Sequence, residues 1–367
     1  MMTQVHQQDQ VTVRRVPPAR YAAIGWLVLV LVVAAVAAWE GRMRSLGLRA
    51  GDRDDSKVHW AVERQKIAAG DHDGVAIIGG SRILFDTDLD VWQELSGRRP
   101  IQLALPGMSG QRFLADLAYH SDFAGLVLMD VTPEQFFRQG PGNPEFEGVL
   151  DEWDTHGPAK RLGHQLGLFL SHHFAFLDDQ YALSRFIDQL DMPNRGGVIG
   201  PYLRPWKLSE AYDDRQHFLW RQIETNERLR NHAIDVWLNG PARNRPPPGE
   251  ELIARICADV RESVARIRAR GGDVAFIRSP SSGEYYAREQ RDVPRDRSWD
   301  LLLRETDAFG IHFEDYPEMQ GLDIPELSHL SRESATRFTR AYVAVLSNNL
   351  SRFGASALGS PVGGDRG

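Results

Sequence analysis

Residues 75–82 read VAIIGGSR, and the rest of the chain is organised around this stretch. Its four apolar residues, three of them β-branched, predict a short buried strand. The two glycines allow a sharp turn, and Ser81 stands where the next helix would begin. Many α/β enzymes present a serine nucleophile in this way, with backbone N–H groups at the helix start facing the reacting oxygen. The stretch also fits an ordinary strand–helix turn in which Ser81 caps the helix.

Strand-like and helix-like segments alternate on both sides of this turn. Residues 101–105 and 126–131 predict two further strands before the middle of the chain, and residues 274–277 and 311–313 predict two more after it. Helical patterns separate them. This alternation predicts an α/β fold with a parallel sheet and helices on both faces, a three-layer arrangement.

The alternation stops in the middle of the chain. Residues 162–190 and 218–238 carry apolar residues at helical spacing, and the stiff stretch 246–249 (PPPG) closes the region. We expect a mostly helical insertion over the carboxyl edge of the sheet, whose aromatic side chains form a small core of their own: Phe169, Phe174, Phe176, Tyr202, Trp206 and Trp220. The predicted division is 54–137 for the first half of the main domain, 138–249 for the insertion, 250–352 for the second half and 353–367 for a disordered tail.

Charge and cysteine content exclude some functions. The 43 basic and 50 acidic residues leave a net charge of −7, which argues against nucleic acid as a main partner. The single cysteine, Cys257, excludes an intrachain disulfide and a multi-cysteine metal site. The adjacent His172 and His173 point in different directions on a helix, so they predict no compact metal site. We expect no metal and no cofactor.

The N-terminal region contains one segment suited to a membrane. Residues 21–39 hold no charge and would span about 28 Å as a helix, close to the thickness of the hydrocarbon core. We predict a transmembrane signal anchor preceded by a cytoplasmic tail, residues 1–20. The alternative is a secretory signal cleaved after Ala37, which would leave an ordinary secreted esterase.

Candidate chemistry lies in the loops at the carboxyl edge of the predicted sheet, where ligands bind in such folds. Ser81 follows the first strand, and His329 precedes the last helix, so an imidazole is available to activate the hydroxyl. The imidazole needs an acceptor that fixes its tautomer, and Glu326 and Asp323 are the two candidates. The backbone N–H groups of Ser81 and Gly107 are candidate donors of an oxyanion hole.

Three further residues are candidates for substrate binding. Arg82 lies beside the serine, where it would either hold an anionic group of a substrate or pair with Asp86. Arg278 and Ser281 follow the fourth strand, in a polar stretch that would line a substrate groove or form a plain turn.

The ordered set of these pieces resembles the SGNH or GDSL-like hydrolases. The matching residues are Gly80-Ser81, Gly107-Met108-Ser109-Gly110 and Glu326-Leu327-Ser328-His329-Leu330. The resemblance covers residues 72–138 and 250–350. It implies a flavodoxin-like αβα sandwich with Ser81 as nucleophile, His329 as base and Glu326 as its acid.

The chain departs from the family pattern at three places. The usual Asp before the serine is missing, the triad acid is Glu, and no Asn follows the third strand, where residues 130–134 read DVTPE. The Gly-Ser pair without the Asp, together with the N-terminal apolar segment, resembles the sequence pattern of the membrane-anchored acyl-transfer branch. That branch includes the alginate O-acetylation and D-alanyl-teichoic-acid transfer proteins. That resemblance implies a single-pass protein of the cytoplasmic membrane with its main domain in the periplasm, and a multi-span acyltransferase as partner.

Two functions therefore remain open from the sequence. The first is a serine acyl-esterase or O-acyltransferase that acts on acetyl groups of an extracytoplasmic polysaccharide. The second is a catalytically weak or inactive binding or assembly protein of a polysaccharide-modifying complex, because loss of one oxyanion donor typically costs a factor of about 10²–10³ in rate.

Overall fold

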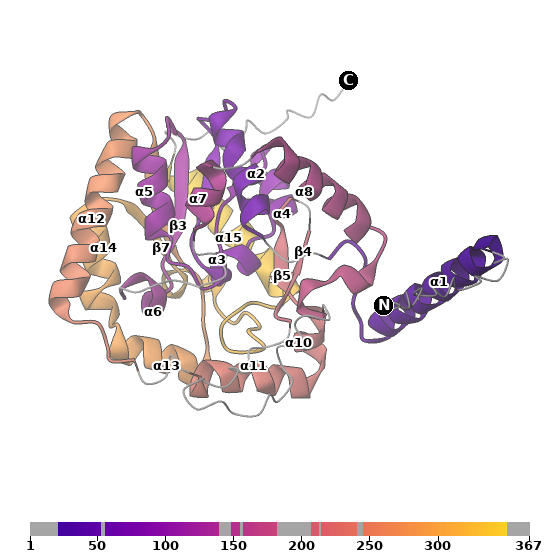
Figure 1. The fold of residues 1–367 in the computed structure, drawn as a ribbon. Helices are drawn as coiled ribbons and strands as arrows, with labels where there is room; N and C mark the ends of the chain where they lie inside the picture. The colour runs from indigo at the N-terminus through magenta and orange to yellow at the C-terminus, as the bar shows by residue number, and fades with distance from the viewer. Residues whose placement is uncertain are drawn as a thin grey trace, which may run out of the picture.

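A computed structural model describes residues 21–52, 56–138, 148–154, 157–181, 207–212, 214–240 and 245–350 (Figure 1). At its centre lies a five-stranded sheet in the order β2-β1-β3-β6-β7, and all neighbouring strands run parallel. Counted within this sheet alone, the order is 2-1-3-4-5, which is also the order of flavodoxin-like doubly wound sheets. The strands are β1 (Val75–Ile78), β2 (Ile101–Gln102), β3 (Leu126–Asp130), β6 (Asp273–Arg278) and β7 (Phe309–His312).

Helices cover both faces of this sheet because the strand side chains alternate between two apolar clusters. Ala76 and Ile78 of β1 face one cluster, whereas Val75 and Ile77 face the other. The first cluster holds side chains of α2 (Lys57–Ala68), α5 (Gln111–Tyr119), α12 (Glu250–Ala269) and α14 (Trp299–Thr306). The second holds side chains of α3 (Ser81–Asp86), α4 (Leu89–Ser96) and α15 (Arg332–Asn349). The predicted α/β fold with a parallel sheet is confirmed.

One prediction about the helix after Ser81 needs correction. The helical pattern extends from Ile83 to Leu95, but the structure has two helices, α3 and α4, with Thr87 between them in an extended conformation. Asp88 then caps α4, since its side chain accepts from the backbone N–H groups of Asp90 and Val91. Helix α3 therefore ends at the extended Thr87, and α4 begins as a separate helix after Asp88.

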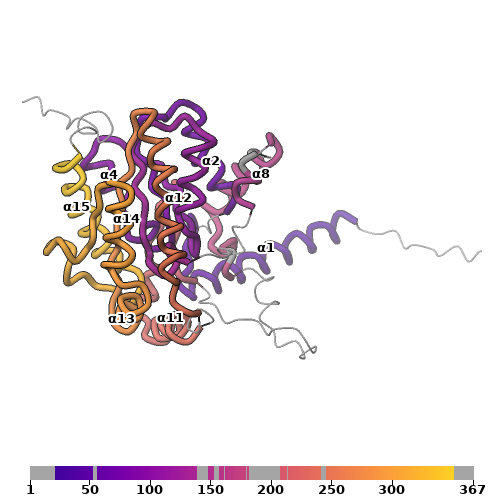
Figure 2. Tube along the Cα trace, turned by 90° about the vertical axis from the view of Figure 1, so that its left-hand side faces the viewer, coloured from indigo at the N-terminus to yellow at the C-terminus, as the bar shows by residue number. Residues whose placement is uncertain are grey.

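Helix α1 (Tyr21–Ser45) extends away from the sheet domain (Figures 1 and 2). It is long and apolar enough to cross a membrane. Its large apolar side chains are exposed over most of its length, from Tyr21 to Val36. The predicted N-terminal apolar helix is therefore confirmed. The two predicted tails, residues 1–20 and 353–367, lie outside the described residues.

The central region holds both helices and strands. Its described elements are α7 (Val149–Asp154), α8 (Pro158–Ser171), η2 (Ala175–Leu177), η3 (Asp179–Tyr181), β4 (Ser209–Ala211), β5 (His217–Leu219), α10 (Arg221–Thr225) and α11 (Glu227–Asn239). The strands β4 and β5 pair antiparallel. The prediction of one continuous helix over 218–238 is wrong, because Phe218 lies in β5 and Asn226 caps a separate helix, α11.

The predicted aromatic core of this region forms only in part. Trp220 is buried with Tyr181 and Ala175, but Phe169 is 62% exposed. Tyr202 and Trp206 lie outside the described residues. Met43 joins the same cluster, so the end of α1 packs into the core of the central region.

The remaining short elements lie along the carboxyl edge and the last strand. They are α6 (Pro133–Phe136), α13 (Gly283–Asp292), η5 (Arg295–Arg297), η6 (Phe313–Asp315) and η7 (Pro317–Met319). Helices α6 and α13 contact each other, and α11 contacts α13. Part of the central region therefore reaches the edge where the predicted site residues lie.

Candidate functional site

Ser81 is the first residue of α3 and directly follows the glycine turn at the end of β1. Gly79 has a φ of +146°, and a Cβ built there would lie 2.6 Å from Cβ of Asp130 at the end of β3. Only glycine fits such a close approach of two neighbouring strand ends. Ser81 thus stands where the connections of β1 and β3 diverge to opposite sides of the sheet, the usual ligand position in doubly wound folds.

The structure brings Ser81, His329 and Glu326 together. Nε2 of His329 lies 2.8 Å from Oγ of Ser81, and Nδ1 of His329 lies 2.7 Å from Oε1 of Glu326. Both His329 and Glu326 are buried, at 1% and 0% exposure, whereas Ser81 is half-buried. A hydroxyl, an imidazole and a carboxylate joined in this order form the geometry in which a serine becomes a nucleophile.

The loop that carries His329 is fixed by several contacts. The backbone N–H of Leu330 donates to Oδ1 of Asp86 at 2.9 Å, and the N–H of Ser282 donates to the carbonyl of Leu327 at 3.0 Å. Leu327 itself has a φ of +74°, a strained conformation for a branched residue. The surrounding hydrogen bonds therefore hold the backbone in a bend that turns His329 toward Ser81.

Of the two candidate acids, only Glu326 reaches the imidazole. Its Oε1 also accepts the backbone N–H of His329 at 2.6 Å, so this oxygen fixes both the ring and the main chain. Asp323 supports the loop through its backbone instead. Its N–H donates to Ser334 and its carbonyl accepts from Ser331.

The two predicted oxyanion donors lie on neighbouring turns. The chain after β2 continues beside β1, with Leu105 N–H donating to the Gly79 carbonyl at 3.1 Å, and then turns at Gly107, whose φ is +71°. The next carbonyl, that of Met108, comes within 3.2 Å of a Cβ built on Gly80. Gly107 is exposed, so this side of the Ser81 turn opens to solvent.

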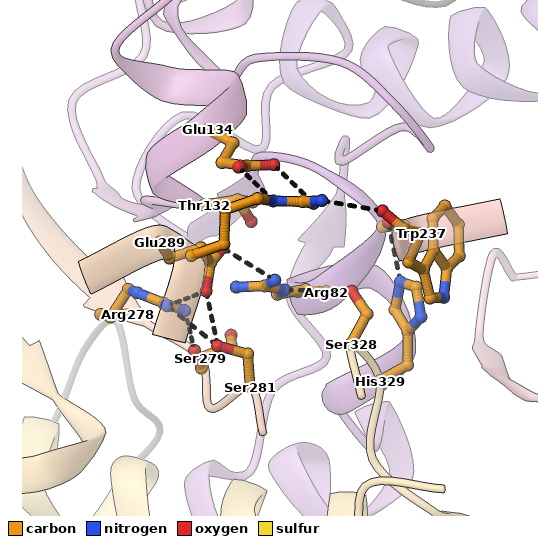
Figure 3. A network of polar contacts seen from close by, with 12 residues as sticks. Arg82, Thr132, Glu134, Trp237, Arg278, Ser279, Ser281, Glu289, Ser328 and His329 are labelled. Atoms are coloured by element: carbon orange, nitrogen blue, oxygen red, sulfur yellow. Dashed lines mark hydrogen bonds and ion pairs between the residues drawn. The ribbon is translucent and has the colours of Figure 1, made fainter. Parts of the chain in front are cut away.

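Arg82 is only 1% exposed, and its guanidinium lies between Glu289 and Ser328 (Figure 3). Its Nη2 forms an ion pair with Glu289 of α13 at 2.9 Å, and its Nε donates to Oγ of Ser328 at 3.3 Å. The arrangement favours an internal clamp between the serine helix and the histidine loop over a contact with substrate. Asp86, the other expected partner, instead accepts from Leu330, and burial raises its pKa well above the ordinary value.

Arg278 and Ser281 belong to the same buried cluster (Figure 3). Arg278 pairs with Glu289 at 2.7 Å, and Ser281 donates to the same carboxylate at 2.6 Å. Burial alone would raise the pKa of Glu289, but the guanidinium groups of Arg278 and Arg82 hold it below its ordinary value. Both side chains are at most 5% exposed, so their described contacts are structural.

Trp237 of α11 is a residue of the site that the sequence does not predict. Its indole N–H donates to Oε2 of Glu326. Its ring lies beside that of His329 (Figure 3), with the two centroids 6.0 Å apart. The Trp237 carbonyl in turn accepts from Arg288 of α13 at 3.0 Å, and Arg288 pairs with Glu134. Glu326 therefore receives hydrogen bonds on both carboxylate oxygens, one of them from the central region.

Gln135 is the second residue that sequence reasoning missed. It lies on α6, directly after β3, and its side-chain amide oxygen comes within 2.7 Å of a Cβ built on Gly80. This oxygen is buried and has no hydrogen-bond partner among the described residues. The available signal was positional, since Gln135 follows residues 130–134, the stretch that lacks the Asn of the SGNH or GDSL-like pattern.

Metal ligands do not cluster in the described part of the chain, where no group of three His, Cys, Asp or Glu residues is placed to hold an ion. Nδ1 of His172 lies 2.8 Å from the carbonyl of Leu168, and Nδ1 of His173 lies 2.7 Å from that of Phe169, within their own helical turn. Burial raises the pKa of the Cys257 thiol to about 11, which leaves it protonated and unreactive at neutral pH.

No protein-family model matches this chain, and no curated protein matches it either.

Proposed function

We propose that this protein is a membrane-anchored serine acyl-esterase or O-acyltransferase. The observation that carries the proposal is the continuous chain of hydrogen bonds from Ser81 through His329 to Glu326, at 2.8 and 2.7 Å. A structural serine at a helix start needs no buried imidazole behind it. A nucleophilic serine needs both the imidazole and the carboxylate.

The reaction that this site supports has two halves. Oγ of Ser81 attacks the carbonyl carbon of an acyl ester while Nε2 of His329 takes the hydroxyl proton. The negative charge on the carbonyl oxygen is stabilised by the backbone N–H groups of Ser81 and Gly107. The tetrahedral intermediate collapses, His329 returns the proton to the leaving alcohol, and the acyl group stays on Ser81.

In the second half, water or another hydroxyl attacks the acyl-enzyme. His329 removes the proton of the attacking group and passes it to Oγ of Ser81 as the ester bond to Ser81 breaks. Water gives the free acid, and a sugar hydroxyl gives a new ester. The side-chain amide of Gln135 lies against the Gly80 turn with its oxygen nearest, so it would replace the missing Asn as a donor only after rotation brings its NH₂ group to that position.

The resemblance to SGNH or GDSL-like hydrolases supports the substrate class. Its membrane-anchored acyl-transfer branch combines a Gly-Ser pair with one apolar N-terminal segment, and this chain has both in Gly80-Ser81 and α1. We therefore propose acetyl groups of an extracytoplasmic polysaccharide as the substrate. The proposal includes a periplasmic position of the sheet domain and a multi-span acyltransferase as the source of the acyl group.

The test is covalent labelling of the full chain in detergent or lipid discs with a fluorophosphonate. We expect one adduct, mapped by mass spectrometry to the peptide that contains Ser81. Ser347→Ala is the matched control, since this serine on α15 donates to a carbonyl of its own helix. Labelling that persists in Ser81→Ala, or its absence in the parent protein, would reject the enzyme and favour a non-catalytic assembly protein.

A second prediction concerns Trp237→Phe. The change keeps an aromatic ring beside His329 but removes the N–H donor to Glu326. A hydrogen bond to a charged group contributes about 1.5–3 kcal/mol, so kcat for an acetyl ester should fall by about 10- to 100-fold with KM unchanged. Steady-state kinetics on a chromogenic acetyl ester measure both constants.

The control for this prediction is Trp92→Phe. The Trp92 indole N–H is buried without a hydrogen-bond partner among the described residues, so the same substitution there removes no contact of the triad. We expect kcat of Trp92→Phe to match that of the parent. Equal kcat values for the two variants would show that the donor to Glu326 does not act in turnover.

A further inference from the structure

Helix α8 carries an exposed apolar stripe. Leu162, Leu166 and Phe169 are 58%, 55% and 62% exposed, and Leu170 is 44% exposed. Their spacing of four, three and one residues places them on one face of the helix. Large apolar side chains gathered in this way on a water-exposed helix mark an interaction surface.

The other side of α8 packs on the domain. The His164 ring lies 5.3 Å from that of His59 on α2, and both His164 and Leu168 are half-buried. The helix is therefore attached to the domain through one face and leaves the apolar stripe uncovered.

The end of α8 is joined directly to α1. Glu40 of α1 accepts the backbone N–H groups of Ala175 and Phe176 at 3.1 and 3.0 Å, in the turn that follows α8. Arg44 donates to the carbonyl of His173 at 3.4 Å, and the N–H of Gly51 donates to the carbonyl of Ser171 at 2.7 Å. The last turns of the apolar helix and the end of α8 thus form one connected unit.

Both views place α8 on the side of the domain from which α1 extends. In Figure 1 the end of α8 turns toward the domain-proximal end of α1, and in Figure 2 both helices lie on the same side of the sheet layers. A bilayer that contains α1 would therefore lie on the α8 side of the domain.

We propose that the stripe of Leu162, Leu166, Phe169 and Leu170 contacts the lipid surface of the bilayer that α1 spans. The occupant is argued from continuity, because the hydrogen bonds of Glu40 and Arg44 fix α8 next to the end of the spanning helix. An amphipathic helix in this position lies in the interface, with its apolar face toward the acyl chains. The inference rests on α1 as a membrane span and not on the chemistry of Ser81.

The experiment uses the full chain with Cys257→Ala as background, reconstituted as single copies in discs of phosphatidylcholine and phosphatidylglycerol. An environment-sensitive nitrobenzoxadiazole probe is attached to a cysteine introduced by Phe169→Cys or Leu166→Cys. Ser347→Cys is the matched control, because this exposed residue lies on α15, which covers the opposite face of the sheet from α2 and α8. Val32→Cys reports on α1. Each probe is quenched in turn by a doxyl-labelled lipid and by aqueous iodide.

We expect the probes at positions 166 and 169 to be quenched by the doxyl lipid several times more strongly than the probe at 347, and to be shielded from iodide. Iodide quenching at 166 and 169 equal to that at 347 would overturn the proposal, since the stripe would face water. Shielding from both quenchers would also overturn it, because protein would then cover the stripe. If the doxyl lipid did not quench the probe at position 32, α1 would not span the bilayer, and the proposal would also be overturned. Ester turnover in the same discs is a separate readout, so failure of the enzyme proposal remains distinguishable.

Discussion

Acyl-ester turnover by the Ser81→Ala variant should fall by about 10⁴- to 10⁶-fold, to a rate that oxyanion stabilisation and binding alone can sustain. The hydroxyl that attacks the ester is absent, and His329 has no group to deprotonate. Removal of one member of such a set costs nearly as much as removal of all, because the residues act as a unit. Initial rates with a chromogenic acetyl ester measure the loss.

The same variant should keep its fold. Ser81 is half-buried at the first position of α3, where alanine is a good helix former. We expect the thermal unfolding midpoint of Ser81→Ala to stay close to that of the parent protein. A variant that retains turnover would contradict the assignment, and a variant that unfolds would be replaced by Ser81→Gly in the same assay.

The second large effect is expected for Glu326→Gln, with a loss of kcat of about 10⁴-fold, as for a comparable change of a triad acid to its amide. The structure gives a reason in hydrogen-bond donors and acceptors. Oε1 of Glu326 accepts from His329 and Oε2 accepts from Trp237, so both positions require an acceptor. A glutamine offers one oxygen and one NH₂ group, and in either orientation a donor faces a donor.

This conflict can be tested with a double-mutant cycle. Trp237→Phe lowers the activity of the parent, but in the Glu326→Gln background it removes the opposing donor and lets the amide oxygen turn toward His329. We therefore expect Trp237→Phe to raise kcat about 10-fold in that background, so that the two changes are not additive. Losses that simply add would show that Trp237 and Glu326 act independently. Glu326→Asp, which keeps two acceptors, should lose less than Glu326→Gln.

Much of the sheet could be predicted because its signals are local. Buried parallel strands leave continuous apolar runs such as residues 75–78 and 126–129, and the helices between them carry clear apolar periodicity. Ser81 and His329 could be placed at one edge because the carboxyl ends of parallel strands meet there. The distances between them, and the choice of Glu326 over Asp323, depend on loop bends that no periodicity describes.

The rest depended on contacts between distant segments. Trp237 reaches Glu326 from a helix of the central region, and its position in the sequence looks like any aromatic on a helical face. The strands β4 and β5 have three residues each, which is too short for alternation to be recognised. The sequence left Arg82 either to hold an anionic group or to pair with Asp86, but a helix turns consecutive side chains to different faces, and Arg82 pairs with the buried Glu289 instead.

The hydrogen bonds between Glu40 and the backbone of Ala175 and Phe176 also set the mechanical character of the anchor. If the segment between Ser45 and Lys57 were a flexible chain, the r.m.s. distance between its ends would be about 18 Å. The sheet domain could then move by about that distance relative to α1. On the proposal that α1 spans a membrane, the Glu40 hydrogen bonds replace this freedom with a fixed junction and hold Ser81 at one distance from the bilayer. On the same proposal, an ester substrate would have to reach that distance from the bilayer before any reaction at Ser81.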